Sequence, residues 1–86
     1  MAPVTSATIS VRLFARYADL LKTSQLEISA DGIRTVRDVL RRIEAIPGGA
    51  ELVRGALVAV NLVHARPDTP VSASDEIALL PPLAGG

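Results

Sequence analysis

The stretch TVRDVLRRIEAI, residues 35–46, decides the fold expected of this sequence. Its apolar residues recur at the spacing of one helical face, on positions Val36, Val39, Leu40, Ile43 and Ile46. Such a stripe predicts an amphipathic helix that packs on a core. Thr35 precedes the stripe and Asp38 follows three residues later, which is the arrangement of a capping box. The turn residues Pro47-Gly48-Gly49 end the predicted helix.

Before this helix, apolar and polar residues alternate as they do in half-buried strands. Residues 8–13 and 25–29 show the alternation. Residues 14–21 between them predict a short helix, whose apolar face would hold Ala15, Tyr17, Ala18 and Leu21. After the central helix, residues 50–56 are ambiguous between a loop and a short turn of helix.

Two further apolar segments follow downstream. Residues 57–63 are continuously apolar apart from Asn61, which predicts a strand in the middle of the sheet that is buried on both faces. Residues 63–66 either continue that strand or return after a bend near Asn61. Residues 76–80 predict the last strand, which ends at Pro81 and Pro82 because proline has no N–H for a ladder. The predicted fold class is therefore α+β: a roll in which a mixed sheet of four to five strands packs on one main helix, with the last strand beside the first.

Length and composition restrict the function. The chain has 86 residues, nine basic and nine acidic side chains, one histidine and no cysteine. This suits one domain, which we place at residues 8–82, between a leader at 1–7 and a tail at 83–86. The lack of cysteine excludes a disulfide framework and a thiolate metal site, and one histidine excludes a multi-histidine metal centre. Balanced charge and two aromatic residues do not support a nucleic-acid partner. With no membrane span and no signal peptide recognised, we expect a cytoplasmic protein.

No residues in the sequence form a recognisable catalytic arrangement. His64 is flanked by apolar residues in a predicted strand, where a structural or surface role is expected. Asp75 and Glu76 are adjacent on a strand and would point to opposite faces. Gly48-Gly49 follows a helix and lacks the pattern of a phosphate loop. Three arginines of the central helix are expected on its solvated face rather than at a partner site: Arg37, Arg41 and Arg42. We therefore expect no active site within the chain itself.

The sequence ends with Leu83-Ala84-Gly85-Gly86, directly after Pro81-Pro82. The prolines favour an extended exit from the domain. The two glycines carry no side chain that would obstruct a narrow channel. The Gly86 carboxylate would then be an unhindered acyl group for another enzyme to activate. A frayed terminus is the alternative interpretation.

Four stretches resemble the MoaD/ThiS family of ubiquitin-like sulfur carriers, and most closely the small subunits of molybdopterin synthase. They are Val11–Arg16 with Asp19-Leu20, Thr35–Leu40, Val58–Asn61 and Asp75–Gly86. The last stretch is the most specific, because an acidic pair, an apolar strand, Pro-Pro and Gly-Gly occur together. The resemblance implies a β-grasp, ubiquitin-like fold.

The resemblance also implies a function. In the family, an E1-like adenylating enzyme uses ATP to activate the C-terminal carboxylate, which a sulfur donor converts to a thiocarboxylate. The large synthase subunit, expected to form a heterotetramer with the small one, takes this sulfur to convert cyclic pyranopterin monophosphate to molybdopterin. Carried over, Gly86 is the adenylated and thiocarboxylated residue, and the chain holds no tightly bound cofactor and no metal. The other residues with implied roles are the tail residues Leu83, Ala84 and Gly85, the large-subunit contacts Phe14 and Leu80, and the tail exit at Pro81 and Pro82.

Two features depart from the family pattern, and other functions stay open. Leu79 and Leu80 stand where aromatic residues often precede the prolines, and Ala84 stands where a charged or polar residue often precedes the glycines. One alternative is a sulfur carrier for thiamine thiazole synthesis or tRNA thiolation, and another is a ubiquitin-like modifier or interaction module. A free-standing enzyme is least favoured, although the chain would be the sulfur-donating subunit of a sulfurtransferase.

Overall fold

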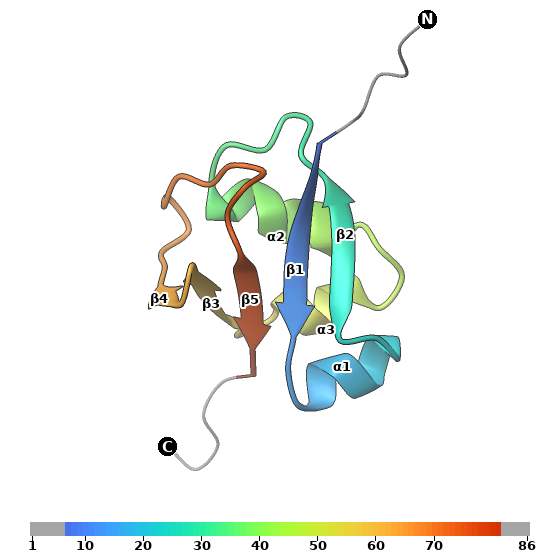
Figure 1. Ribbon diagram of the computed structural model, residues 1–86. Helices are drawn as coiled ribbons and strands as arrows, with labels where there is room; N and C mark the ends of the chain where they lie inside the picture. The colour runs from blue at the N-terminus through green and yellow to red at the C-terminus, as the bar shows by residue number, and fades with distance from the viewer. Residues whose placement is uncertain (1–6, 82–86) are drawn as a thin grey trace, which may run out of the picture.

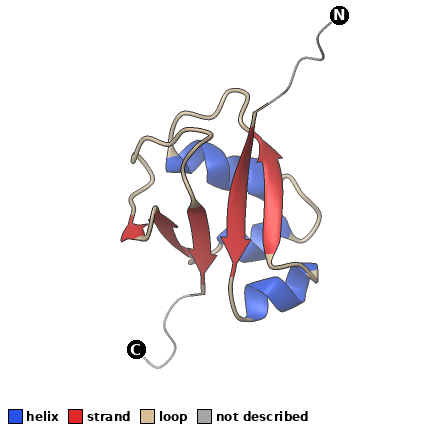
Figure 2. Cartoon of the chain, in the orientation of Figure 1, coloured by secondary structure: helices blue, strands red, loops and turns tan. Residues whose placement is uncertain are grey.

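The computed structural model of the chain describes residues 7–81. The predicted tail and most of the predicted leader lie outside these residues. The elements follow in the order β1 (Thr8–Leu13), α1 (Arg16–Leu21), β2 (Gln25–Ser29), α2 (Val36–Glu44), α3 (Gly49–Val53), β3 (Leu57–Val60), β4 (Val63–His64) and β5 (Ile77–Leu80). Helices α2 and α3 lie behind the sheet in Figure 1, and α1 lies at the end where β1 and β5 finish (Figure 2).

The five strands form one mixed sheet in the order β2-β1-β5-β3-β4. The central pair, β1 and β5, is parallel, with Leu13 opposite Leu79. All other neighbouring strands are antiparallel. The predicted α+β roll is confirmed, including the mixed sheet on one main helix and the last strand beside the first. This is the arrangement of a β-grasp fold.

The core lies between the sheet and α2. Asp38 closes the predicted capping box at the start of α2, since its carboxylate accepts the backbone N–H groups of Thr35 at 3.2 Å and of Arg34 at 2.9 Å. These two hydrogen bonds hold the pKa of Asp38 below its ordinary value, and the bond from Arg34 has the larger effect. The buried apolar residues are Ile9, Val11, Leu13, Tyr17, Ile28, Ile33, Val36, Val39, Ile43, Leu52, Val58, Val71, Ile77 and Leu79.

The helix boundaries differ from the sequence expectation. Helix α1 begins at Arg16 rather than at residue 14, because Ala15 has a positive φ of 53° and is exposed instead of lying on the buried face. Helix α2 ends at Glu44, before Ile46. Gly49, expected in the helix stop, instead begins the short helix α3, so the helical alternative for the ambiguous segment is confirmed. Only glycine fits there, because a Cβ at this position would lie 1.8 Å from the carbonyl oxygen of Ile43.

The prediction of one strand over residues 57–63, buried on both faces, is wrong. Strand β3 ends at Val60, and the chain returns along β4, so the alternative with a bend near Asn61 is correct. Of β3, only Val58 is buried, whereas Leu62 is 87% and Val63 is 68% exposed. The continuous apolar run therefore comprises one strand and the tip of a hairpin.

The tip of this hairpin holds an unusual residue. Asn61 and Leu62 form the two-residue turn, with φ values of 53° and 71°. Positive φ at both positions defines a type I′ turn, which favours Asn followed by Gly. Leucine is strained in this region because its Cβ crowds the backbone. Leu62 is mostly exposed, so burial of its side chain does not compensate for the strain.

We expect Leu62→Gly to raise the free energy of unfolding by about 0.5–1 kcal/mol, because it removes a side chain from a positive-φ position. Val63→Gly is the matched control, since Val63 is also exposed but lies in a strand, where glycine destabilises. Urea unfolding of the three proteins would measure both effects. A less stable Leu62→Gly protein would contradict the strain argument.

Candidate functional site

The candidate site lies at the end of the sheet where β1 and β5 finish side by side. Because Leu13 and Leu79 are paired in a parallel register, Phe14 and Leu80 come to the same end. Phe14 is 42% exposed, and Leu80 and Pro81 are half-buried. The structure thus places the predicted partner contacts Phe14 and Leu80, and Pro81 of the predicted tail exit, at the same end of the sheet. Figure 1 shows β1 and β5 finishing at this end. The remaining predicted site residues, Pro82, Leu83, Ala84, Gly85 and Gly86, lie outside the described residues.

A strip of half-buried apolar residues crosses the sheet face opposite the helices. Ile77 and Leu79 point into the core, so Ala78 and Leu80 point to the other face. Leu57 pairs with Leu80 and Ala59 pairs with Ala78 in the antiparallel register, so all four share that face. We call Leu57, Ala59, Ala78 and Leu80 the outer strip. No described helix covers it, which makes it suited to packing against another protein.

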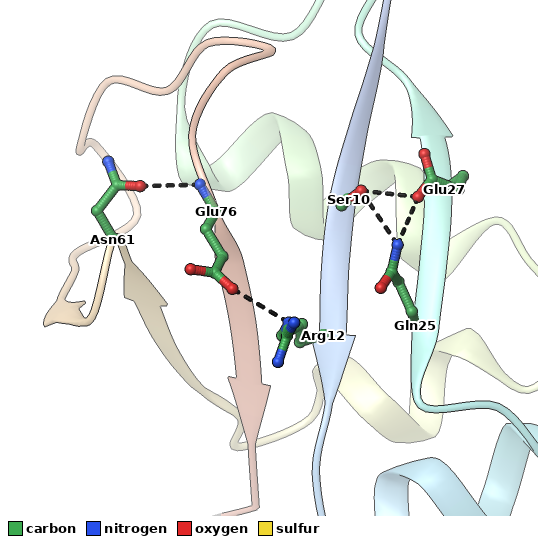
Figure 3. A network of polar contacts seen from close by, with 6 residues as sticks. All are labelled: Ser10, Arg12, Gln25, Glu27, Asn61 and Glu76. Carbon is green, nitrogen blue, oxygen red and sulfur yellow. Dashed lines mark hydrogen bonds and ion pairs between the residues drawn. The ribbon is translucent and has the colours of Figure 1, made fainter.

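Polar side chains border the outer strip on the β1–β2 side (Figure 3). Arg12 lies opposite Ala78 and pairs with Glu76 at 3.1 Å. On the next strand, the Glu27 carboxylate accepts hydrogen bonds from Ser10 and Gln25, both at 2.7 Å. Hydrogen bonds from Ser10, Gln25 and Thr8, in that order, lower the pKa of Glu27. These contacts are exposed and add little stability, but they orient charges beside the apolar strip.

Asn61 joins the β3–β4 hairpin to the start of β5, a role that the sequence analysis missed. Its backbone N–H donates to the carbonyl oxygen of Glu76 at 2.7 Å. Its side-chain oxygen accepts the N–H of Glu76 at 2.9 Å, and its side-chain amide donates to the Asp75 carboxylate at 2.9 Å. Asn61 thus fixes the beginning of the strand that leads to the tail. The available signal was a lone polar residue interrupting an apolar run.

The described residues contain no arrangement suited to acid–base or metal chemistry. His64 is exposed on β4, opposite Ala59. Asp75 and Glu76 bond to different partners, Asn61 and Arg12, so they do not act as a carboxylate pair. Within residues 7–81 there is no cluster of three or more potential metal ligands. In the same range, no helix is both long and apolar enough to cross a membrane.

Comparison with known proteins finds one family. The ThiS family model matches residues 11–86, which includes every element from β1 onward except the first part of that strand. The match also spans the Gly-Gly end of the sequence. Because the match covers most of the chain, it establishes family membership.

Solved structures agree with this match. The Haloferax volcanii small archaeal modifier protein 1 is 27% identical, with a TM-score of 0.74 over 90% of this chain and 99% of that one. Subunit 1 in a complex with subunit 2 of the molybdopterin-converting factor from Helicobacter pylori is similar at 25% identity and a TM-score of 0.67, over 92% and 99% of the two chains. Urm1 from Trypanosoma brucei, at 21% identity, has a TM-score of 0.57 over 98% of this chain and 100% of its own, and supports the fold alone. The chain thus has the fold of the ubiquitin-like sulfur carriers.

The polar contacts around Asn61 predict how stability depends on pH. Hydrogen bonds from the Asn61 amide, and next from the Ser72 N–H, hold the pKa of Asp75 below its ordinary value of 3.8. The unfolded chain therefore takes up the proton first as pH falls. The stabilising contribution of Asp75 is complete above its ordinary pKa and is lost as pH falls through the lower folded value.

We expect the free energy of unfolding to fall below about pH 4, and to fall less steeply in Asp75→Asn. Asp68→Asn is the control, because Asp68 is exposed and the bonds from Asn61 and Ser72 go to Asp75 instead. Urea titrations at several pH values between 6 and 3 would measure the slopes. Equal slopes in the parent and Asp75→Asn proteins would contradict the proposed contacts of Asp75.

Proposed function

We propose that this chain, which belongs to the ThiS family, is the sulfur carrier and small subunit of a molybdopterin synthase. An E1-like enzyme would use ATP to adenylate the Gly86 carboxylate, and a sulfur donor would convert the adenylate to a thiocarboxylate. The large subunit would then take this sulfur for cyclic pyranopterin monophosphate. The observation that supports the proposal most is the family match, which extends through the two terminal glycines.

The chemistry explains why such a carrier needs no active site. A carboxylate is a poor electrophile, and adenylation gives it AMP as a leaving group that sulfur can displace. The thiocarboxylate formed is a better nucleophile than the carboxylate. Both steps would use groups of the partner enzymes, so this chain has to supply only a slender terminus and a surface by which it is recognised. The arrangement of Phe14, Leu80 and the outer strip around the tail exit supports that role.

The large subunit is proposed as the partner of the tail end of the sheet. A relative of this chain is known in a complex of subunits 1 and 2 of a molybdopterin-converting factor. Phe14 and the outer strip would contribute apolar packing at such an interface, and Arg12 and Glu76 would lie at its polar rim. A single complex of this kind would align the tail with the active site of the partner.

A ubiquitin-like modifier is the second candidate. It is favoured by the similarity to the small archaeal modifier protein 1, which is slightly more identical than the converting-factor subunit. Both functions begin with activation of the terminal carboxylate. They differ in the group that attacks the activated carboxylate. In a sulfur carrier this group is the sulfur of a donor, and in a modifier it is an amine of a target protein.

We expect that deletion of Gly86 abolishes ATP-dependent thiocarboxylate formation and leaves the fold intact. Intact-mass measurement after incubation with the activating enzyme, ATP and sulfide would show one oxygen replaced by sulfur in the parent chain only. Ala84→Ser, which alters the tail but keeps both glycines, is the control and should react normally. Sulfur loading of the shortened chain would refute the role of Gly86.

We expect Leu80→Asp to weaken binding of the large subunit by at least about tenfold, ~1.4 kcal/mol, because the variant would bury a charge in an apolar contact. Leu62→Asp is the matched control, since it places the same charge on an exposed leucine of the β3–β4 hairpin, away from the tail exit. Titration calorimetry would measure both affinities, and circular dichroism would verify that both variants fold. Unchanged affinity of Leu80→Asp would remove Leu80 from the interface.

A further inference from the structure

The chain carries almost no nucleophilic amines. It contains eight arginines but a single lysine, Lys22. A guanidinium group stays protonated at physiological pH and does not attack acyl groups, whereas a lysine amine does when it loses its proton. Lys22 therefore holds the only side-chain amine of the sequence that can form an amide bond.

The structure presents this amine openly. Lys22 is exposed at the C-terminal end of α1, where its backbone has a φ of 58° and its N–H donates to the carbonyl oxygen of Ala18. Among residues 7–81 the one ion pair joins Arg12 and Glu76, so no described carboxylate pairs with Lys22. A fixed backbone and an unpaired side chain leave the amine accessible to another molecule.

Lys22 also lies at the end of the molecule where β5 finishes. Helix α1 follows β1 directly, and β1 runs parallel to β5. The segment after Lys22 returns to the sheet at the same end, since the N–H of Leu13 donates to the carbonyl oxygen of Ser24 at 2.9 Å. Figure 1 shows α1 and the end of β5 together at this end of the sheet. Lys22 and the end of β5 therefore lie at the same end of each copy.

We infer that Lys22 is the residue at which one copy of this chain is joined to the activated carboxyl terminus of another. The inference rests on the proposed activation of Gly86. In the reaction, the uncharged amine of Lys22 attacks the acyl carbon of the Gly86 adenylate. The new C–N bond replaces the bond from carbon to the phosphate oxygen, AMP leaves with the electron pair of that bond, and the amine releases one proton to water. The product is a dimer joined by one isopeptide bond.

The same chemistry makes sulfur and Lys22 competitors for one adenylate. Sulfide that captures the acyl group gives the thiocarboxylate, which is a much poorer acyl donor than the adenylate. Dimer formation should therefore be greatest when the sulfur donor is absent. The sulfur supply would decide whether activated chains become carriers or conjugates.

The test is incubation of the full chain with its activating enzyme and ATP, with and without sulfide. We expect a species with the mass of two chains less one water, which decreases when sulfide is added. Peptide mapping should find the branch at Lys22, and Lys22→Arg should lose the dimer while it still forms the thiocarboxylate. A dimer that persists in Lys22→Arg would overturn the inference.

Two further measurements separate the possible failures. Hydroxylamine traps an acyl adenylate as a hydroxamate whether or not a lysine is present. A chain that forms the hydroxamate but no dimer would overturn the assignment of Lys22 alone, whereas a chain that forms neither would refute the proposed activation. Arg34→Lys in the Lys22→Arg background moves the amine to an exposed position just before α2, away from the tail end. We expect this double variant to form no dimer. If it formed the dimer, the position of Lys22 would not matter and that part of the inference would be overturned.

Discussion

The parallel pairing of β1 with β5 is the constraint on which the rest of the structure depends. These strands come from opposite ends of the chain and form the centre of the sheet. Their inward residues, among them Val11 and Leu79, are fully or almost fully buried beneath α2. Closing the long loop between these strands costs entropy, which burial of their inward residues offsets. The position at which the C-terminal segment leaves the domain is therefore set by the core itself.

The two faces of the sheet have different tasks. On the inner face, the apolar stripe of α2 packs against the sheet and completes the buried apolar core, which stabilises the fold. On the outer face, Ala78 and Leu80 are only half-buried, and Arg12 and Glu76 lie exposed beside them. Among the described residues, no helix covers the outer strip (Figure 1). Because the same strand, β5, contributes to both faces, rigid packing on the inner side fixes the geometry of the surface on the outer side.

Residue patterns predicted those elements that local interactions determine. Helix α2 combines an apolar period with a capping residue, so both its face and its start could be deduced. The apolar run from residue 57 was misjudged, because periodicity cannot distinguish a doubly buried strand from a strand followed by an apolar turn. The turn itself lacks the glycine that normally marks it, since Leu62 occupies that position. Asn61 was missed as a link to β5 for a similar reason: its partners Asp75 and Glu76 are distant in sequence and are brought near only by the fold.

The candidate site shows the same difference between what the sequence reveals and what only the fold reveals. In the proposed function, the Gly86 carboxylate would owe its reactivity to partner enzymes, so its role could be inferred from the sequence without any side-chain geometry. Its side reactions, in contrast, depend on which nucleophiles the folded chain presents near it. Eight of the nine Lys and Arg residues are arginine, so the chain carries positive charge but few amines that could intercept the activated carboxylate of the proposed function. The exception, Lys22, is exposed at the end of the sheet where β5 finishes, so the proposed selectivity between sulfur transfer and amide formation would depend on a single side chain.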